Sequence, residues 1–171
     1  DPRGVFIATE LKRVMAGCER SLTPDLDVID AIVFGEYDDD TPTEHGFVSI
    51  VGTVARSYAV WLDGRNTAGE SHDHDGHASA GGAMTLRAAA VAAGGSVSQG
   101  AEIDARVCDC CQTDAAMTNE GAVVVYRDRS DDEVRDIAIV RHTADGWSEP
   151  VHVSNDGWRI DACPVNGPAV D

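Results

Sequence analysis

The sequence is poor in basic residues and has no long apolar run. Of its 171 residues only 13 are lysine or arginine, against 30 aspartate and glutamate residues, and the formal net charge is −17. A surface this acidic repels the phosphates of nucleic acids and of anionic lipids, so we expect neither nucleic acid nor membrane as a partner. The stretch of about 18 apolar residues that a membrane-spanning helix needs is absent as well.

Aromatic residues are also scarce, at 5%, yet hydrophobic residues make up 43% of the chain. That content excludes a disordered polypeptide, and the length is sufficient for one domain with a core. Cysteine is present five times, at Cys18, Cys108, Cys110, Cys111 and Cys163. An odd number cannot pair completely within one chain, so we expect a free thiol, a metal ligand or a link to another chain.

Residues 1–40 differ in pattern from the rest. Their apolar residues recur at helical spacing, which predicts a partly helical N-terminal segment. From residue 41 onward, short apolar runs alternate with Gly, Asp and Asn, which predicts an all-β domain over 41–171. The expected strands are 46–51, 57–62, 84–92, 113–117, 122–127, 136–142 and 147–153.

An internal repeat indicates which all-β fold this is. The apolar run that ends in Trp61 matches the run that ends in Tyr126, and each continues with one residue and then an aspartate, Asp63 or Asp128. A second apolar strand follows each copy. Such repeats are typical of β-propellers, which are built from four-stranded blades. We therefore predict a β-propeller-type repeat, with two full blades and part of a third.

The repeat also places three potential metal ligands at one equivalent position. His45 precedes the aromatic residue of the first copy by the same number of residues as Cys110 precedes that of the second. Residues 166–169 begin a third copy and align with 113–116, which puts Cys163 level with Cys110. Equivalent positions at the start of the innermost strands surround the axis of a propeller. We therefore expect these three side chains to converge at one mouth of the channel.

Several motifs resemble those of a known family. The stretches concerned are 41–49, 61–65, 84–87, 104–114, 126–130 and 162–168. They are similar to those of bacterial sialidase-like β-propeller proteins of the Asp-box (BNR) type, over roughly residues 41–171, whereas 1–40 do not follow the family. The resemblance implies a six-bladed propeller and an exo-sialidase, a glycosidase that acts on a carbohydrate. A secreted propeller, periplasmic or extracellular, is also a plausible host for disulfides.

The residues that would carry glycosidase chemistry are carboxylates and arginines that follow the strands. An arginine can bind the carboxylate of an acidic sugar, and a carboxylate can act as acid or base. The alternative is a turn in which the same pairs stabilise each blade, and the occurrence of the pair in both copies favours this alternative. The residues concerned are Asp63, Asp128, Arg65, Arg127 and Arg129.

The cysteine motif allows two kinds of site. Thiolates and imidazole suit zinc or copper, which predicts a metal site formed by His45, Cys108, Cys110, Cys111 and Cys163. The alternative is disulfide bonding, with Cys108 or Cys110 joined to Cys163, or a vicinal bond between Cys110 and Cys111. The cysteines would then stabilise a structural or assembly module. Under both interpretations the sulfur atoms meet in space.

Two further features are weaker. The segment 72–77 alternates histidine with aspartate and glycine, which suits either a divalent metal or, more often, a solvated insert. Trp158 lies on an expected connection and is a candidate for ligand contact. Finally, two blades cannot close a ring, because propellers have four or more. We therefore expect self-association or a further part of the chain to complete the ring.

Overall fold

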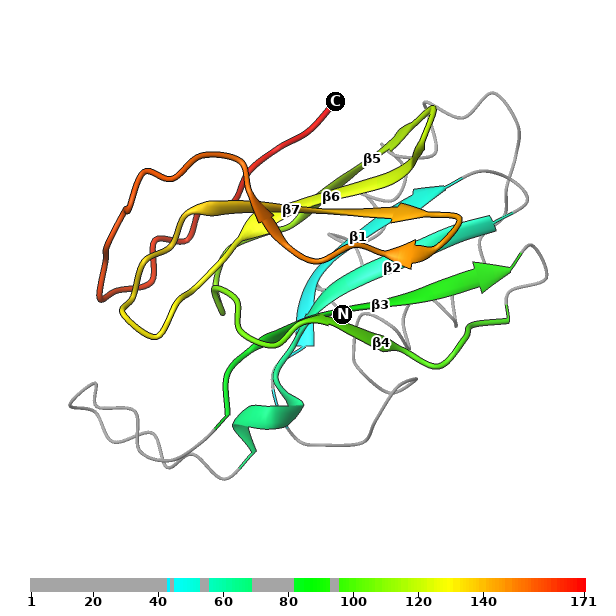
Figure 1. Ribbon diagram of the computed structural model, residues 1–171. Helices are drawn as coiled ribbons and strands as arrows, with labels where there is room; N and C mark the ends of the chain where they lie inside the picture. The colour runs from blue at the N-terminus through cyan, green and yellow to red at the C-terminus, as the bar shows by residue number, and fades with distance from the viewer. Residues whose placement is uncertain (1–42, 44, 53–55, 69–81, 93–95) are drawn as a thin grey trace, which may run out of the picture.

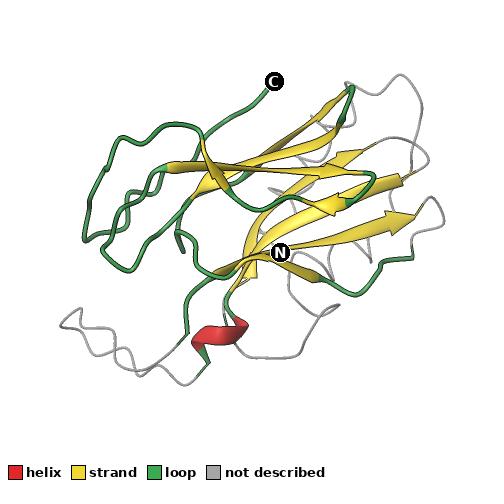
Figure 2. Ribbon diagram, in the orientation of Figure 1, coloured by secondary structure: helices red, strands yellow, loops and turns green. Residues whose placement is uncertain are grey.

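The computed structural model describes residues 43, 45–52, 56–68, 82–92 and 96–171 (Figure 1). Within these ranges the fold is all-β, as predicted: nine strands form two antiparallel sheets, and one short 3-10 helix, η1 (Arg65–Thr67), follows the second strand (Figure 2). The helical segment expected in 1–40 and the histidine-rich segment 72–77 lie outside the described residues. No described helix is long and apolar enough to cross a membrane.

The first sheet is a meander of four strands in the order β1-β2-β3-β4. The central strand β2 alternates between the two faces, so that both faces carry buried residues. The edge strand β4 is polar and only half buried or exposed. The strands are β1 (His45–Gly52), β2 (Arg56–Asp63), β3 (Thr85–Ala92) and β4 (Ala101–Asp104).

The second sheet repeats this arrangement in the order β5-β6-β7-β8, and β9 also pairs with β7. The expected strand over 147–153 is divided into two short strands, with Pro150, which has no N–H to donate, in the connection. The strands are β5 (Asp114–Thr118), β6 (Gly121–Arg127), β7 (Ile137–Thr143), β8 (Gly146–Trp147) and β9 (Val151–His152).

The two sheets lie one over the other and share the main core (Figure 1). Residues of β2 and β3 on one side meet residues of β6 and β7 on the other. The fully buried members include Val60, Leu62, Leu86, Val124, Tyr126 and Val140. A second cluster, with Ala59, Trp61 and Ala89, lies on the opposite face of the first sheet.

The hairpin between β5 and β6 depends on a glycine. Gly121 has φ +133°, and a Cβ at this position would meet the carbonyl oxygen of His142. Only glycine therefore lets the two strands turn and pair closely with β7. This turn fixes the register in which Val124 and Tyr126 face the first sheet.

Candidate functional site: a four-cysteine cluster

The cysteine motif lies in the loop that joins the two sheets, between β4 and β5. Val107 forms a bridge with Asp128, and the backbone N–H of Cys108 donates to the carbonyl of Arg127 at 3.0 Å. The backbone N–H of Val107 also donates to the carbonyl of Met84, at 2.9 Å. The loop is thus fastened to the ends of both sheets, and this holds the thiols in fixed positions.

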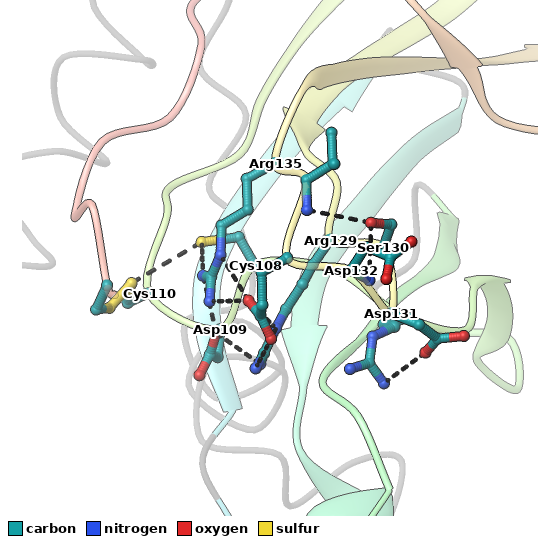
Figure 3. Close-up of polar contacts among 12 residues, drawn as sticks. Cys108, Asp109, Cys110, Arg129, Ser130, Asp131, Asp132 and Arg135 are labelled. Carbon is teal, nitrogen blue, oxygen red and sulfur yellow. Dashed lines mark hydrogen bonds and ion pairs between the residues drawn. A yellow bond between two sulfur atoms is a disulfide. The ribbon is translucent and has the colours of Figure 1, made fainter. Parts of the chain in front are cut away.

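Four sulfur atoms meet at this loop. Cys110 and Cys163 form a disulfide, which confirms one of the pairings expected from the sequence. Cys108 and Cys111 are free thiols, each 1% exposed. The Sγ atoms of Cys108, Cys110 and Cys111 all lie within 4.8 Å of one another, and those of Cys108 and Cys110 are 3.9 Å apart (Figure 3). This spacing allows one metal ion to contact all three sulfurs.

The environment keeps Cys111 protonated in the metal-free protein. Burial raises the pKa of the Cys111 thiol, and its hydrogen bond with Cys108 contributes further, to about 11. A bound metal would displace this proton, since a thiolate is the ligating form.

Cys163 is positioned by residues 158–170, which we call the C-terminal strap. On one side of Cys163, the carbonyl of Trp158 accepts from the N–H of Arg135 at 2.8 Å. On the other side, Asn166 accepts two hydrogen bonds from the Arg127 guanidinium, at 2.9 and 3.0 Å. A Cβ on Gly167 would collide with the backbone of Gln112, so this glycine permits the strap to lie directly on the loop.

A buried arginine lies against the sulfurs (Figure 3). The Arg135 side chain is 4% exposed, and its Nη1 donates to Cys108 Sγ at 3.3 Å. Its other nitrogens donate to the Glu133 carboxylate, which also binds Arg129 at 2.8 Å. Asp109, within the cysteine motif, lies 3.4 and 3.5 Å from the two guanidiniums. Two guanidiniums and two carboxylates thus balance each other in charge, and the guanidinium of Arg135 lies directly beside the Cys108 thiol.

Asp63 and Arg65 form an ion pair at the end of β2, in which the carboxylate is buried and the guanidinium is partly exposed. The Asp63 side chain is completely buried and accepts hydrogen bonds from Trp61 Nε1 at 2.8 Å and from Arg65 Nε at 2.8 Å. Burial alone would raise the pKa of this carboxyl, but the hydrogen bonds from Arg65 and Trp61 outweigh burial and lower the pKa to about 2. The pair fixes the turn after β2.

The equivalent residues of the second repeat are more open. Asp128 is 20% exposed and binds His152 Nε2 at 2.7 Å, which raises the pKa of the histidine. The Arg127 guanidinium stacks on the Trp158 ring, 4.5 Å from its centre. Arg129 binds Glu133 and Asp109, as described above. Asp128, Arg127 and Arg129 thus stand together after β6, whereas Asp63 and Arg65 belong to the other sheet.

His45 begins β1, where its backbone is opposite Asp63; the position of its imidazole is outside what the structure describes. Sequence reasoning missed Arg135, Glu133 and Asp109 altogether. It also missed the buried hydrogen bond from the Tyr126 hydroxyl to Asp104 Oδ2, at 2.6 Å.

Comparison of the chain with protein-family models, with curated proteins and with solved structures gives no match. The fold and the site therefore define the class of protein by themselves. It is an all-β protein of two antiparallel sheets, with a disulfide and a group of cysteines that can hold a metal at the junction of the sheets.

Proposed function

We propose that this chain is a metal-binding module, formed by adjacent blades of a β-propeller, that holds a zinc or cuprous ion through clustered cysteines. The observation that carries the proposal is the convergence of three Sγ atoms within 4.8 Å, with Cys163 bonded to one of them. Soft thiolate ligands favour zinc and cuprous ions over hard cations. Cys108, Cys110, Cys111 and Cys163 would be the four ligands.

Front-to-back packing of the sheets supports the propeller. The β2 residues in the shared core are Val60 and Leu62, whereas those of β6 are Val124 and Tyr126. Tyr126 is the repeat equivalent of Trp61, which lies on the opposite face of β2. The face of β2 that enters the core is therefore not the repeat equivalent of the face of β6 that it meets. Such a contact between two different faces is heterologous, and its repetition by rotation generates a ring.

The first strands of the sheets are also adjacent, as the innermost strands of neighbouring blades would be. β1 and β5 contact each other, and Ser49 Oγ lies 2.7 Å from Thr113 Oγ1. Thr113 is two residues beyond Cys111, so the sulfurs would lie near the axis. A further blade or a second copy of the chain would complete the ring. The disulfide fits a periplasmic or extracellular location.

Elemental analysis tests the metal proposal. We expect protein reduced and handled without oxygen to bind about one equivalent of zinc or copper, because four thiols complete a tetrahedral set. Cys110→Ser should weaken this binding, because it leaves three of the four thiols, and Cys18→Ser is the matched control that should bind as tightly as the wild type. Reduced wild-type protein that retains neither metal would contradict the proposal.

A second candidate function, binding or hydrolysis of an acidic sugar, is favoured by the residues after β6. Trp158 is 38% exposed and packs against the Arg127 guanidinium, and the next residue, Asp128, pairs with His152. An indole can stack on a sugar ring, and an arginine can bind a sugar carboxylate. The resemblance to sialidase-like propellers points to the same chemistry.

A fluorogenic sialoside tests this second candidate. Wild-type protein should release the fluorophore, and Asp128→Asn should abolish the release because it removes the ionised carboxylate. The matched control is Asp145→Asn, because Asp145 lies in the exposed turn before β8, and this variant should hydrolyse the sialoside as the wild type does. If wild-type protein neither hydrolyses the sialoside nor binds sialic acid, the candidate is rejected.

A further inference from the structure

We propose that the Cys110–Cys163 disulfide is a redox gate for the metal site: closed, it withholds two of the four thiols, and opened by a dithiol reductant, it completes the ligand set. This inference rests on the proposed metal-binding function. It concerns the regulation of the site, which the metal proposal leaves open. Three features of the cluster support it.

The first feature is the number of available ligands. With the disulfide closed, only Cys108 and Cys111 of this cluster remain as thiols. A structural zinc site takes four ligands, and catalytic sites still use three from the protein. The closed form therefore offers too few sulfurs to retain zinc.

The second feature is that opening the bond leaves Cys163 in place. The strap is anchored before Cys163 by the bridge between Arg159 and Val134 and by the hydrogen bond from Ile160 N–H to the Glu133 carbonyl, at 3.1 Å. After Cys163 it is anchored by Asn166 on Arg127. With both flanks held, a released Cys163 thiol stays beside the other three sulfurs.

The third feature is a difference in exposure. Cys163 is exposed and Cys110 is half buried, whereas Cys108 and Cys111 are almost completely buried. A reductant can therefore reach the disulfide from the Cys163 side. The two buried thiols are protected from oxidation and modification in the closed form, because exposure governs both reactions.

The gating reaction balances with a dithiol as the co-reactant. One thiolate of the reductant attacks Cys163 Sγ, the Cys110–Cys163 bond breaks, and Cys110 leaves as a thiolate that takes up a proton. The second thiol of the reductant then displaces Cys163, which leaves as a thiol. The reductant departs as a cyclic disulfide, having given two electrons and two protons. Zinc that binds next displaces the thiol protons.

Zinc is the appropriate probe because it has no redox chemistry of its own. Two samples of the full chain are prepared without oxygen. One is oxidised, with its single disulfide verified by alkylation and mass measurement, and the other is reduced with a dithiol and freed of it. Each is titrated with Zn²⁺ against a chromogenic chelator. We expect one equivalent bound by the reduced sample and none by the oxidised sample.

Cys163→Ser provides the second variant. It cannot form the Cys110–Cys163 bond and keeps three thiols, which together with a water can hold zinc. We expect this variant to bind zinc equally before and after dithiol treatment. A Cys163→Ser protein that still requires reduction would overturn the gate.

The outcomes separate the gate from the function on which it rests. Equal zinc binding by oxidised and reduced wild-type protein would overturn the gate and leave the metal-binding proposal standing. Binding by neither sample would overturn the metal-binding proposal itself. An oxidised sample in which all cysteines can be alkylated would overturn the gate as well, because no disulfide would be there to open.

Discussion

Asp63→Asn should lower the free energy of unfolding by about 2 to 3 kcal/mol, because it removes a buried charge that accepts several hydrogen bonds. The Asp63 side chain has no exposure and receives hydrogen bonds from Trp61 and from both the backbone and the guanidinium of Arg65. An asparagine keeps the size of the side chain but loses its charge, and its amide group would face the donors of Arg65. Urea denaturation followed by tryptophan fluorescence measures the change.

The second repeat supplies the matched control. Asp128 occupies the position equivalent to Asp63, but its side chain is 20% exposed and its partner His152 is 36% exposed. An exposed ion pair contributes about 1 kcal/mol or less. Asp128→Asn should therefore lower the free energy of unfolding far less than Asp63→Asn does. Equal losses would contradict the view that the burial of Asp63 determines the size of the effect.

The same carboxylate predicts an acid dependence. Its pKa is lowered from 3.8 to about 2 in the folded protein, so folding favours the ionised form. The resulting stabilisation is complete above pH 3.8 and is lost as the pH falls through 2; it amounts to about 2 kcal/mol. Unfolding curves of wild-type protein should show this loss between pH 4 and pH 2. Asp63→Asn should show a correspondingly flatter profile, and parallel profiles would contradict the assignment.

Short apolar runs bounded by Gly, Asp and Asn were sufficient to predict most of the sheet structure. The strands β2, β3, β6 and β7 carry apolar residues that the core requires, and each overlaps a predicted strand. β4 was missed because the four residues Ala101–Asp104 form no apolar run: two of them are acidic, and all four are exposed or half buried at an edge. Its pairing with β3 depends on backbone hydrogen bonds, which leave no pattern in the side chains.

The candidate site was predictable only in part, for a similar reason. The repeat alignment brought Cys110 and Cys163 together, and the structure joins them. Spacing could not distinguish Cys110 from Cys108 as the partner, because both follow the same strand. Arg135 gave no signal, since it lies in an acidic turn that reads as solvated. Its burial arises from contact with Cys108, which is 27 positions away.

Arg135→Met should weaken both the fold and the metal site. The substitution removes the guanidinium that donates to Cys108 Sγ at 3.3 Å and to Glu133 at 2.8 Å. Hydrogen bonds to charged groups contribute about 1.5 to 3 kcal/mol, and we expect a loss of about 2 kcal/mol in the free energy of unfolding. Glu133 retains Arg129, which keeps the loss moderate.

Zinc affinity of the reduced Arg135→Met protein should fall by about ten- to a hundredfold, the usual effect of removing a group that orients a metal ligand. The guanidinium fixes Cys108 and offsets the negative charge of the thiolates. Arg129→Met is the matched control, because Arg129 binds the same Glu133 and Asp109, whereas the hydrogen bond to Cys108 Sγ comes from Arg135. Competition titrations should show nearly unchanged zinc affinity for Arg129→Met. If both variants lose zinc affinity equally, the charge of either arginine supports zinc binding, and the contact of Arg135 with Cys108 has no special role.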